Sequence, residues 1–324
     1  MTQQPWITRD AVYVGGRWQA SREAPADVVS PATEEAIGRV AVAGPAEVDQ
    51  AVAAARSTFD GSDWRWLPTS ERIAIVRRIA DALEARWHQT ADLITTEGGV
   101  PISASRGLGR SVAAVFHAMA DVGEQFRFEE DRPGYRSPAK VIHEPVGVVG
   151  AITPWNGPVY LIASKLVPAL IAGCTVVVKS AIETPLSAYA LAEACDNAGV
   201  PPGVVSILPG DAAAGRQLVS SPAVDMIAFT GSDSAGRAIM AATSATVKRM
   251  TLELGGKAAA VVLDDVDIEP LMTRLVPGST RNSGQACGVL SRLLVPRRRY
   301  AEILEEYCRR VASLVVGDPR SEET

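Results

Sequence analysis

Apolar and polar residues follow a helical period through most of the first 125 positions. Apolar residues recur three or four positions apart there, which is typical of amphipathic helices. Residues 13–18 are an exception, because they read as two short strands that turn at Gly15 and Gly16. The helices that this pattern predicts span residues 47–59, 70–95 and 101–125.

From residue 146 the pattern changes to short apolar segments that alternate with helical ones. The short segments are continuously apolar, so a sheet built from them is buried on both faces. Strands that alternate with helices in this way are typical of a parallel, doubly wound α/β sheet. The predicted strands are 146–152, 175–178, 204–208 and 226–229, and the predicted helices are 159–170, 185–197 and 232–242.

Residues 126–145 lie between these two parts and have a different character. They carry alternating residues, many charges and the turn-forming pair Pro133 and Gly134. We interpret the segment as a projecting hairpin, whose exposed edge could pair with another subunit. A solvated loop explains the same pattern.

The first domain is expected to close near Leu254, and the remaining residues form only part of a second α/β layer. Two strands and two helices leave free sheet edges and uncovered apolar faces. We therefore expect the second domain to be incomplete, with exposed apolar surface around Val261 and Leu294. The elements predicted there are strands 258–263 and 291–295, a helix that ends near 282, and a helix over 300–315.

Composition is that of a globular protein with a sizeable core, since 47% of the 324 residues are apolar and 21% are charged. The formal net charge of −5 offers no basic excess for nucleic acid or for an anionic membrane. The longest apolar stretch, residues 158–178, is interrupted by Lys165, Pro168 and Gly173, which indicates two buried elements rather than a membrane span.

Four cysteines form no C-x-x-C pair, and the three histidines are far apart in sequence. This usage fits a reducing compartment better than a disulfide framework, and it gives no spacing for metal ligands. The N-terminal residues contain no apolar segment of the kind that a secretory signal needs. We expect a cytoplasmic protein without a bound metal.

Ligands of a doubly wound sheet bind beyond the carboxyl ends of its strands. The first strand is followed by a proline-fixed turn that ends in Asn156, whose amide suits a developing oxyanion or simply caps the turn. Lys179 directly follows the second strand, where it could meet a ribose or phosphate or remain solvated. Gly231, Ser232 and Gly236 lie where a strand gives way to a helix, whose free N–H groups would suit a phosphate.

Two further residues could carry chemistry. Glu253 is a carboxylate inside an apolar strand, where burial would make it a stronger base. Cys287 lies in a polar, glycine-containing turn, where an accessible thiol could act as a nucleophile. An inert buried cysteine is the alternative for Cys287.

Taken together in this order, these segments resemble the signatures of the aldehyde dehydrogenase superfamily. The separation of Glu253 and Cys287 (287 − 253 = 34) also fits that family. The resemblance runs from about Tyr13 to the end of the chain. The matching segments are T-P-W-N at 153–156, V-V-V-K at 176–179, F-T-G-S at 229–232, L-E-L-G-G-K at 252–257 and G-Q-A-C at 284–287.

The resemblance implies a role for each matching residue. Cys287 would be the nucleophile, Glu253 the general base, and Asn156 the side-chain half of an oxyanion hole completed by the backbone N–H of Cys287. Residues 1–254 would bind NAD or NADP, residues 255–324 would begin the catalytic domain, and a small aldehyde would be the substrate. A homo-oligomer, dimer or tetramer, is implied for the complete protein. The implied cofactor contacts are Ile152, Thr153, Trp155, Lys179, Ile182, Gly231, Ser232, Gly236 and Leu254.

The sequence departs from the family pattern in two places. Ile182 stands where a ribose-binding glutamate is common, and the chain ends at Thr324, before the family's usual C-terminus. We therefore weigh a catalytically incomplete fragment or a non-catalytic binding subunit beside the enzyme. A third reading is an enzyme that passes the acyl group to coenzyme A, but that chemistry needs no general base, so the presence of Glu253 favours hydrolysis to the acid.

Overall fold

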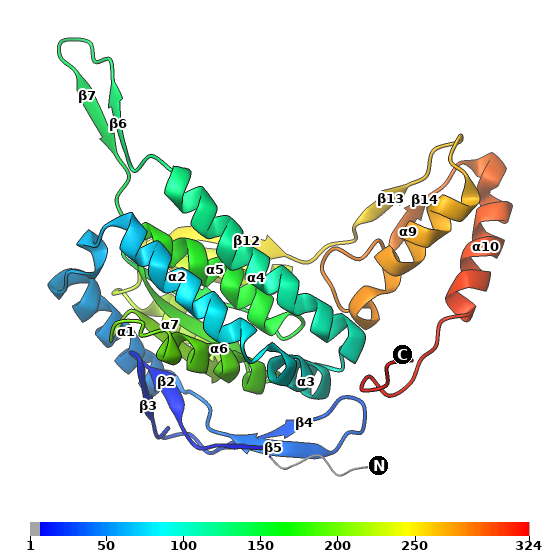
Figure 1. Cartoon of the computed structure of the whole chain (residues 1–324), viewed down its shortest axis with the longest axis horizontal. Helices are drawn as coiled ribbons and strands as arrows, with labels where there is room; N and C mark the ends of the chain where they lie inside the picture. Colours follow the sequence, from blue (N-terminus) through cyan, green and yellow to red (C-terminus); the bar gives the residue numbers. More distant parts are fainter. Residues whose placement is uncertain (1–6, 324) are drawn as a thin grey trace.

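The computed structural model describes residues 7–323, and its centre is a seven-stranded sheet in the order β12-β11-β8-β9-β10-β2-β3 (Figure 1). Strands β12 to β10 in that order are parallel, and β2 joins the sheet antiparallel to β10. The predicted doubly wound α/β fold is confirmed. The strands are β2 (Val12–Val14), β3 (Arg17–Gln19), β8 (Val148–Ile152), β9 (Thr175–Ala181), β10 (Val205–Gly210), β11 (Met226–Gly231) and β12 (Arg249–Leu254).

Helices cover both faces of this sheet (Figure 1). On one face α5 and α6 contact the strands, and α2, α3 and α4 pack outside them. On the other face lie α1 and α7, with α8 beside them over β11 and β12. The helices are α1 (Pro45–Gly61), α2 (Thr69–Glu84), α3 (Trp87–Gly98), α4 (Ile102–Gln125), α5 (Pro158–Ala172), α6 (Pro185–Asn197), α7 (Ala212–Ser220) and α8 (Asp233–Thr243).

The single helix predicted over 70–95 is wrong, because the chain breaks between α2 and α3. Arg86 leaves helical geometry, and the Trp87 ring packs against Gly109 of α4. A Cβ atom at Gly109 would lie 2.3 Å from that ring, and the indole N–H of Trp87 donates to the Arg106 carbonyl at 3.1 Å. A contact with a later helix therefore sets the break, which the helical period alone does not reveal.

A second, three-stranded sheet and the helix α7 were not predicted. The strands of this sheet are β1 (Ile7–Arg9), β4 (Ala26–Val29) and β5 (Ala36–Val40), in the order β1-β5-β4. They are short, and most of their residues are exposed or half-buried, so they lack a strong apolar pattern. Residues 7–323 also contain short 3₁₀ turns, and one of them, η3 (Arg281–Gly284), lies near the candidate site. The others are η1 (Trp64–Trp66), η2 (Ser244–Thr246) and η4 (Arg297–Arg299).

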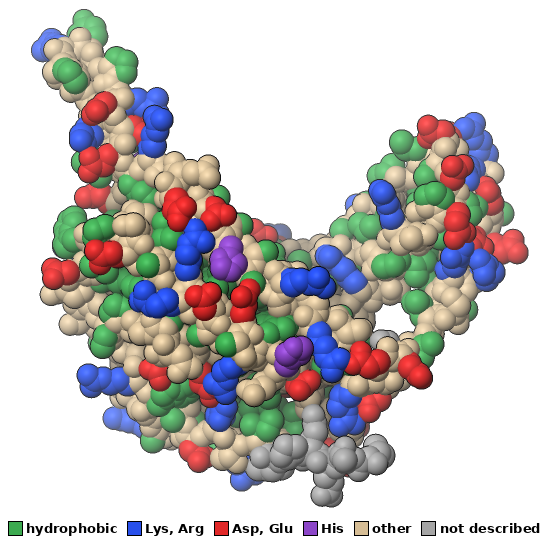
Figure 2. All heavy atoms as spheres, in the orientation of Figure 1, with side chains coloured by type: hydrophobic (Ala, Val, Ile, Leu, Met, Phe, Trp, Pro, Cys, Tyr) green, Lys and Arg blue, Asp and Glu red, His purple; other side chains and the backbone are tan. Residues whose placement is uncertain are grey.

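The hairpin predicted over 126–145 is present as β6 (Glu129–Arg132) and β7 (Ala139–Ile142). It projects from the end of α4, away from the rest of the molecule (Figure 1). The tip residue Tyr135 is 98% exposed, and the space-filling view shows apolar and basic side chains at the tip and further charged side chains along the stem (Figure 2).

A smaller unit follows β12 and has its own apolar cluster. The parallel strands β13 (Ala259–Val261) and β14 (Arg292–Leu294) pair with each other and pack with α9 (Ile268–Thr280) and α10 (Tyr300–Ala312). Val261 and Leu294 are 67% and 48% exposed, as the uncovered strand edges predicted. Figure 2 shows this unit standing apart from the larger body across an open hollow.

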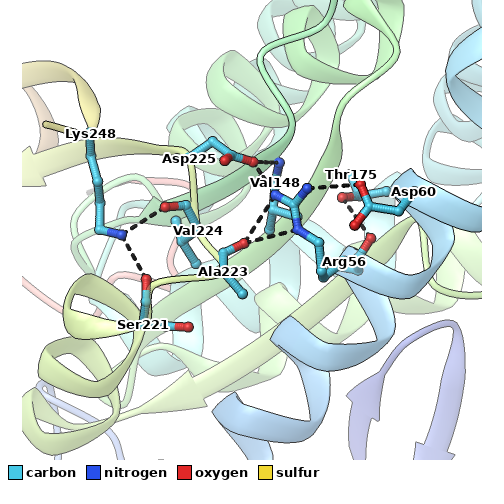
Figure 3. Close-up of polar contacts among 10 residues, drawn as sticks. Arg56, Asp60, Val148, Thr175, Ser221, Ala223, Val224, Asp225 and Lys248 are labelled. Carbon is cyan, nitrogen blue, oxygen red and sulfur yellow. Dashed lines mark hydrogen bonds and ion pairs between the residues drawn. The ribbon is translucent and has the colours of Figure 1, made fainter. Parts of the chain in front are cut away.

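The amino ends of the parallel strands are held together by a polar network (Figure 3). The carboxylate of Asp225, just before β11, accepts from the first backbone N–H of β8 at 2.7 Å and from the guanidinium of Arg56. The buried ammonium of Lys248, just before β12, donates to the carbonyls of Ser221 and Val224 at 2.6 and 2.7 Å. Burial lowers the pKa of Lys248, and the nearby Asp225 opposes that effect. These polar groups therefore have partners that connect α1, β8, β11 and β12.

Candidate active site

The opposite, carboxyl edge of the sheet contains buried hydroxyl groups without partners. The side-chain oxygens of Thr153, Ser180 and Thr230 are inaccessible to solvent and form no hydrogen bond within the described chain. They follow or end β8, β9 and β11, which are adjacent strands. Buried polar groups usually have partners, so unpaired ones at a ligand-binding edge indicate a place for a polar ligand. This edge therefore fits the NAD(P) that the sequence implied.

Lys179 lies inside β9 rather than directly after it, because the strand continues to Ala181. Its backbone carbonyl accepts from the N–H of Thr153 at 3.1 Å, which joins the two strand ends. Burial lowers the pKa of the Lys179 ammonium, and the carboxylates of Glu183 and Asp211 oppose that effect. Ile182, in the turn that follows β9, is half-buried against the core.

The strand–turn–helix segment predicted around Gly231 is present. β11 ends at Gly231, and Ser232 caps α8 by accepting a hydrogen bond from the N–H of Ala235 at 3.2 Å. A Cβ atom at Gly236 would lie 2.8 Å from the Leu254 side chain. Glycine at 236 therefore lets α8 pack closely on the end of β12, and the two predicted positions 236 and 254 are in contact.

Side-chain amides near Cys287 join the larger body to the smaller unit. The amide of Asn156 donates to the Gln285 carbonyl at 2.7 Å. The amide of Asn282 donates to the carbonyls of Asn156 and Gln285, at 3.0 and 3.1 Å. These bonds place Asn156 against the segment that carries Cys287, two residues after Gln285. Ile152 and Thr153 are buried at the end of β8, while Trp155 is 38% exposed.

The backbone before Cys287 is held in an unusual conformation. Asn282, Ser283 and Gly284 have φ values of 54°, 54° and 77°, all in the left-handed region. Such residues cost of order 1–3 kcal/mol each when they are not glycine, and they cluster at functional sites. Cys287, which follows this segment, is exposed, as is Cys308, whereas Cys174 and Cys195 are buried.

Cys287 and Asn156 line the same cavity, which has a volume of about 470 Å³. Its walls come from α3, α4, the start of α5 and the bent segment, and most of them are apolar. Among residues 7–323, Arg281 is the only charged residue that lines it. The residues that line it are Trp87, Ile94, Val100, Ala104, Leu108, Ser111, Val112, Asn156, Gly157, Pro158, Val159, Tyr160, Leu161, Arg281, Asn282, Ala286 and Cys287.

The burial predicted for Glu253 is wrong. Glu253 is exposed, because β12 is the edge strand of the sheet and its residues alternate between exposed and half-buried. The Glu253 charge acts on Lys165 of α5. Burial lowers the pKa of Lys165, and the nearby Glu253 carboxylate opposes that effect. Glu253 does not line the cavity with Cys287 and Asn156.

Sequence reasoning missed Ser180, Thr230 and Arg281. Ser180 and Thr230 are neighbours of Lys179 and Gly231 at strand ends, and a hydroxyl at such a position is a signal that could have found them. Arg281 lies six residues before Cys287, and only the bent backbone brings it into the cavity. A side chain at Gly288 would approach its guanidinium to 2.9 Å.

Comparison with known proteins agrees with this geometry. The sequence model of the aldehyde dehydrogenase family matches residues 18–324. The chain belongs to the aldehyde dehydrogenase family. It is 42% identical over 315 residues to geranial dehydrogenase of Castellaniella defragrans, and 36% identical over 316 residues to the NADP(+) succinate-semialdehyde dehydrogenase GabD of Escherichia coli. These matches cover 96% of this chain in both cases, but 66% and 65% of the relatives.

Solved aldehyde dehydrogenase structures have the same fold. The Mycobacterium tuberculosis enzyme in complex with NAD+ is 39% identical, with a TM-score of 0.95 over 98% of this chain and 66% of that one. A mutant of aldehyde dehydrogenase C from Pseudomonas syringae, in complex with NAD+ and octanal, is 37% identical, with a TM-score of 0.93 over 97% and 64%. The chain thus spans slightly less than two thirds of these family members. Within residues 7–323, no helix is long and apolar enough to cross a membrane.

Proposed function

We propose that this chain carries the cofactor edge and the nucleophile of an enzyme that oxidises an aldehyde to a carboxylic acid with NAD or NADP. The observation that carries the proposal is one cavity lined by both Cys287 and Asn156, with Cys287 exposed after a strained segment. Family membership supports the same reaction. The unpartnered hydroxyls of Thr153, Ser180 and Thr230 support a polar ligand at the adjoining sheet edge.

In the proposed reaction, the Cys287 thiolate attacks the aldehyde carbon and forms a thiohemiacetal. The backbone N–H of Cys287 and one amide N–H of Asn156 stabilise its oxyanion, and one such donor is worth about 10²–10³ in rate. Only one bond of the Asn156 amide, to Gln285, is seen, and an amide has a second N–H to give. NAD(P), when bound, supplies the hydride acceptor.

Loss of hydride leaves a thioester on Cys287, which water must hydrolyse to release the acid. We propose Glu253 as the base that takes a proton from that water, a contribution of about 10²–10⁴ in rate. Glu253 is exposed, and we propose that its carboxylate turns toward the cavity for this step. Glu253→Gln should then give a rapid burst of reduced cofactor and a much slower steady rate. Equal slowing of both phases would remove Glu253 from this role.

We propose that both NAD and NADP bind. Lys179 would meet the adenosine ribose or its 2′-phosphate, and the N-terminus of α8 after Gly231 and Ser232 would meet the pyrophosphate. A glutamate at position 182 would repel a 2′-phosphate, and Ile182 removes that repulsion. Comparing kcat/KM for the two cofactors tests this, and a preference for NAD of several orders of magnitude would defeat it.

The substrate we propose is an aldehyde with an apolar chain. Apolar residues of α4 such as Ala104, Leu108 and Val112 make up much of the cavity wall. The relatives that act on geranial or bind octanal support the same class. Arg281 could instead pair with a carboxylate, so a useful panel sets octanal against succinic semialdehyde.

Aldehyde-dependent reduction of NAD(P) by the 324-residue chain tests the whole proposal. Turnover that is lost when the thiols are blocked would support it. Binding of NAD(P) without turnover for any aldehyde would favour the non-catalytic alternative, a binding subunit or a fragment.

We further propose that the hairpin β6–β7, with its exposed tip, pairs with a second copy of the protein (Figure 2). Deleting residues 129–142 should then lower the mass measured by light scattering.

A further inference from the structure

Glu97, in the last turn of α3, is a buried acid that the proposed chemistry does not use. Glu97 is only 3% exposed. One carboxylate oxygen accepts from the backbone N–H of Leu186 at 2.7 Å. The other accepts from the backbone N–H of Ser187 at 2.9 Å and from the Ser187 hydroxyl. No ion pair to Glu97 is present in the described part of the chain, so its bonds all go to the start of α6.

Leu186 and Ser187 are the second and third residues of α6, where backbone N–H groups have no partner within the helix. Such groups are usually satisfied by the N-cap side chain. The N-cap residue here, Thr184, makes no such bond, and Pro185 follows it. Glu97 therefore does for α6 what an N-cap side chain does elsewhere, although it comes from another helix.

The start of α6 is directly connected to the proposed cofactor edge. Only residues 182–184 separate α6 from β9, the strand that contains Lys179 and Ser180. The Thr184 hydroxyl donates to the backbone carbonyl of Trp155 at 3.3 Å. Fixing the N-terminus of α6 therefore fixes the turn with Ile182 and one side of the turn that carries Asn156.

We propose that Glu97 is a positioning residue for the cofactor: its carboxylate holds the start of α6 so that the turn 182–184 is preformed for the adenosine ribose of NAD(P). This role rests on the proposed function. A loop that is already ordered before the ligand arrives does not lose conformational entropy on binding. Loss of Glu97 should therefore weaken cofactor affinity rather than slow the chemical step.

A matched control is available in Glu47. It is 1% exposed and also caps a helix, since its carboxylate accepts at 2.9 Å from the backbone N–H of Gly44, the N-cap residue of α1. It also accepts at 2.9 Å from the backbone N–H of Arg22, before β4. Its bonds do not reach the turn 182–184. Replacing either acid by glutamine puts an amide NH2 group, which cannot accept a hydrogen bond, opposite a backbone N–H. Both changes should therefore lower the melting temperature.

The experiment measures the Kd for NAD+ by calorimetry with the full chain, in the wild type, Glu97→Gln and Glu47→Gln. We expect Glu97→Gln to raise Kd by about 10-fold, within the usual range of coupling between sites. Glu47→Gln should leave it within about 2-fold of the wild type, since it has no link to the turn. Ser187→Ala removes one donor to Glu97 and serves if Glu97→Gln does not fold, with an expected rise of about 3-fold.

An unchanged Kd in folded Glu97→Gln, or in Ser187→Ala where that variant takes its place, overturns the role of Glu97 alone. An equal rise in Glu47→Gln also overturns it, because the effect would then be general loosening. If the wild type binds neither NAD+ nor NADP+, the proposed function fails, and the role of Glu97 fails with it.

Discussion

The two ends of the same parallel sheet differ in how their buried polar groups are satisfied. At the amino end, Asp225 and Lys248 have several partners each, and the network joins α1 to three strands (Figure 3). At the carboxyl end, the hydroxyls of Thr153, Ser180 and Thr230 are inaccessible to solvent and have no partner in the described chain. The difference between the two ends therefore lies in how their side chains are paired.

This difference separates stability from function within one sheet. An unpaired buried hydroxyl costs about 1–3 kcal/mol relative to a paired one. A sequence that satisfies one end and leaves the other unsatisfied therefore gives up stability where a ligand could supply the missing bonds. Changes at the carboxyl end should mainly alter binding and chemistry, and changes at the amino end should mainly alter stability.

The largest effect is expected for Cys287→Ala, on the carboxyl side. Without the thiol no thiohemiacetal forms, so turnover should fall by about 10⁴-fold or more. The melting temperature and the Kd for NAD+ should stay close to those of the wild type, because Cys287 is exposed. Steady-state kinetics and calorimetry check this, and appreciable turnover by the variant would remove Cys287 from the mechanism.

Glu97 should give the protein a measurable pH dependence of stability. Burial, opposed by the bonds from Ser187 and Leu186, raises its pKa from 4.5 to about 7. Between these two values the folded state holds a proton that the unfolded state has lost. The free energy of unfolding should therefore fall as pH rises from about 4.5 to 7, by at most about 1.4 kcal/mol per unit, and level off above 7.

Urea unfolding of the wild type and Glu97→Gln across this range isolates the contribution of Glu97. The difference in unfolding free energy between the wild type and Glu97→Gln should change with pH over this range. Glu47 is the contrasting acid, because the effect of burial on its pKa is outweighed by backbone bonds, including those from Arg22 and Gly44, and by the charge of Arg22, so that its pKa is lowered. Its contribution should run the other way, lost only as pH falls below 4.5. A difference between wild type and Glu97→Gln that does not change with pH would refute this prediction.

At the amino end, Asp225→Ala should cost about 2 kcal/mol of unfolding free energy. It leaves the first N–H of β8 and the Arg56 guanidinium without their carboxylate. Asp60→Ala is the control, because it loses only the exposed 3.1 Å pair with Arg56 and should cost less than about 1 kcal/mol. Denaturant unfolding measures both. If Asp225→Ala also weakens NAD+ binding, the two ends are not independent.

The smallest effect sharpens the comparison with one chemical change at each end. Thr175→Val, at the start of β9, removes a hydroxyl that donates to the Ala55 carbonyl at 3.1 Å, and should cost about 1 kcal/mol. Thr153→Val, after β8, removes a hydroxyl without a partner and should be neutral or stabilising. Melting curves with and without NAD+ check this. A larger loss of stability in Thr153→Val than in Thr175→Val would contradict the assignment of the two ends.

From residue 146 to β12 the sequence by itself determined the order of strands and helices, with the exception of α7, because continuous apolar strands and helical periods are local properties. It also marked the strand ends that hold Thr153, Lys179 and Gly231, and the turn with Cys287. Residues at the ends of parallel strands must meet at one edge, so this part of the candidate site followed from order alone.

Only the tertiary structure decided which groups find partners. Trp87 breaks the helix predicted over 70–95 by packing on Gly109, and Glu253 is exposed because its strand became an edge. Glu97 meets Leu186, 89 positions away. A local pattern records which face of an element is apolar, but it does not record the distant element that covers that face. Burial, charge pairing and unsatisfied hydroxyls depend on that covering element, so the sequence alone did not reveal the roles of Ser180, Thr230 and Arg281.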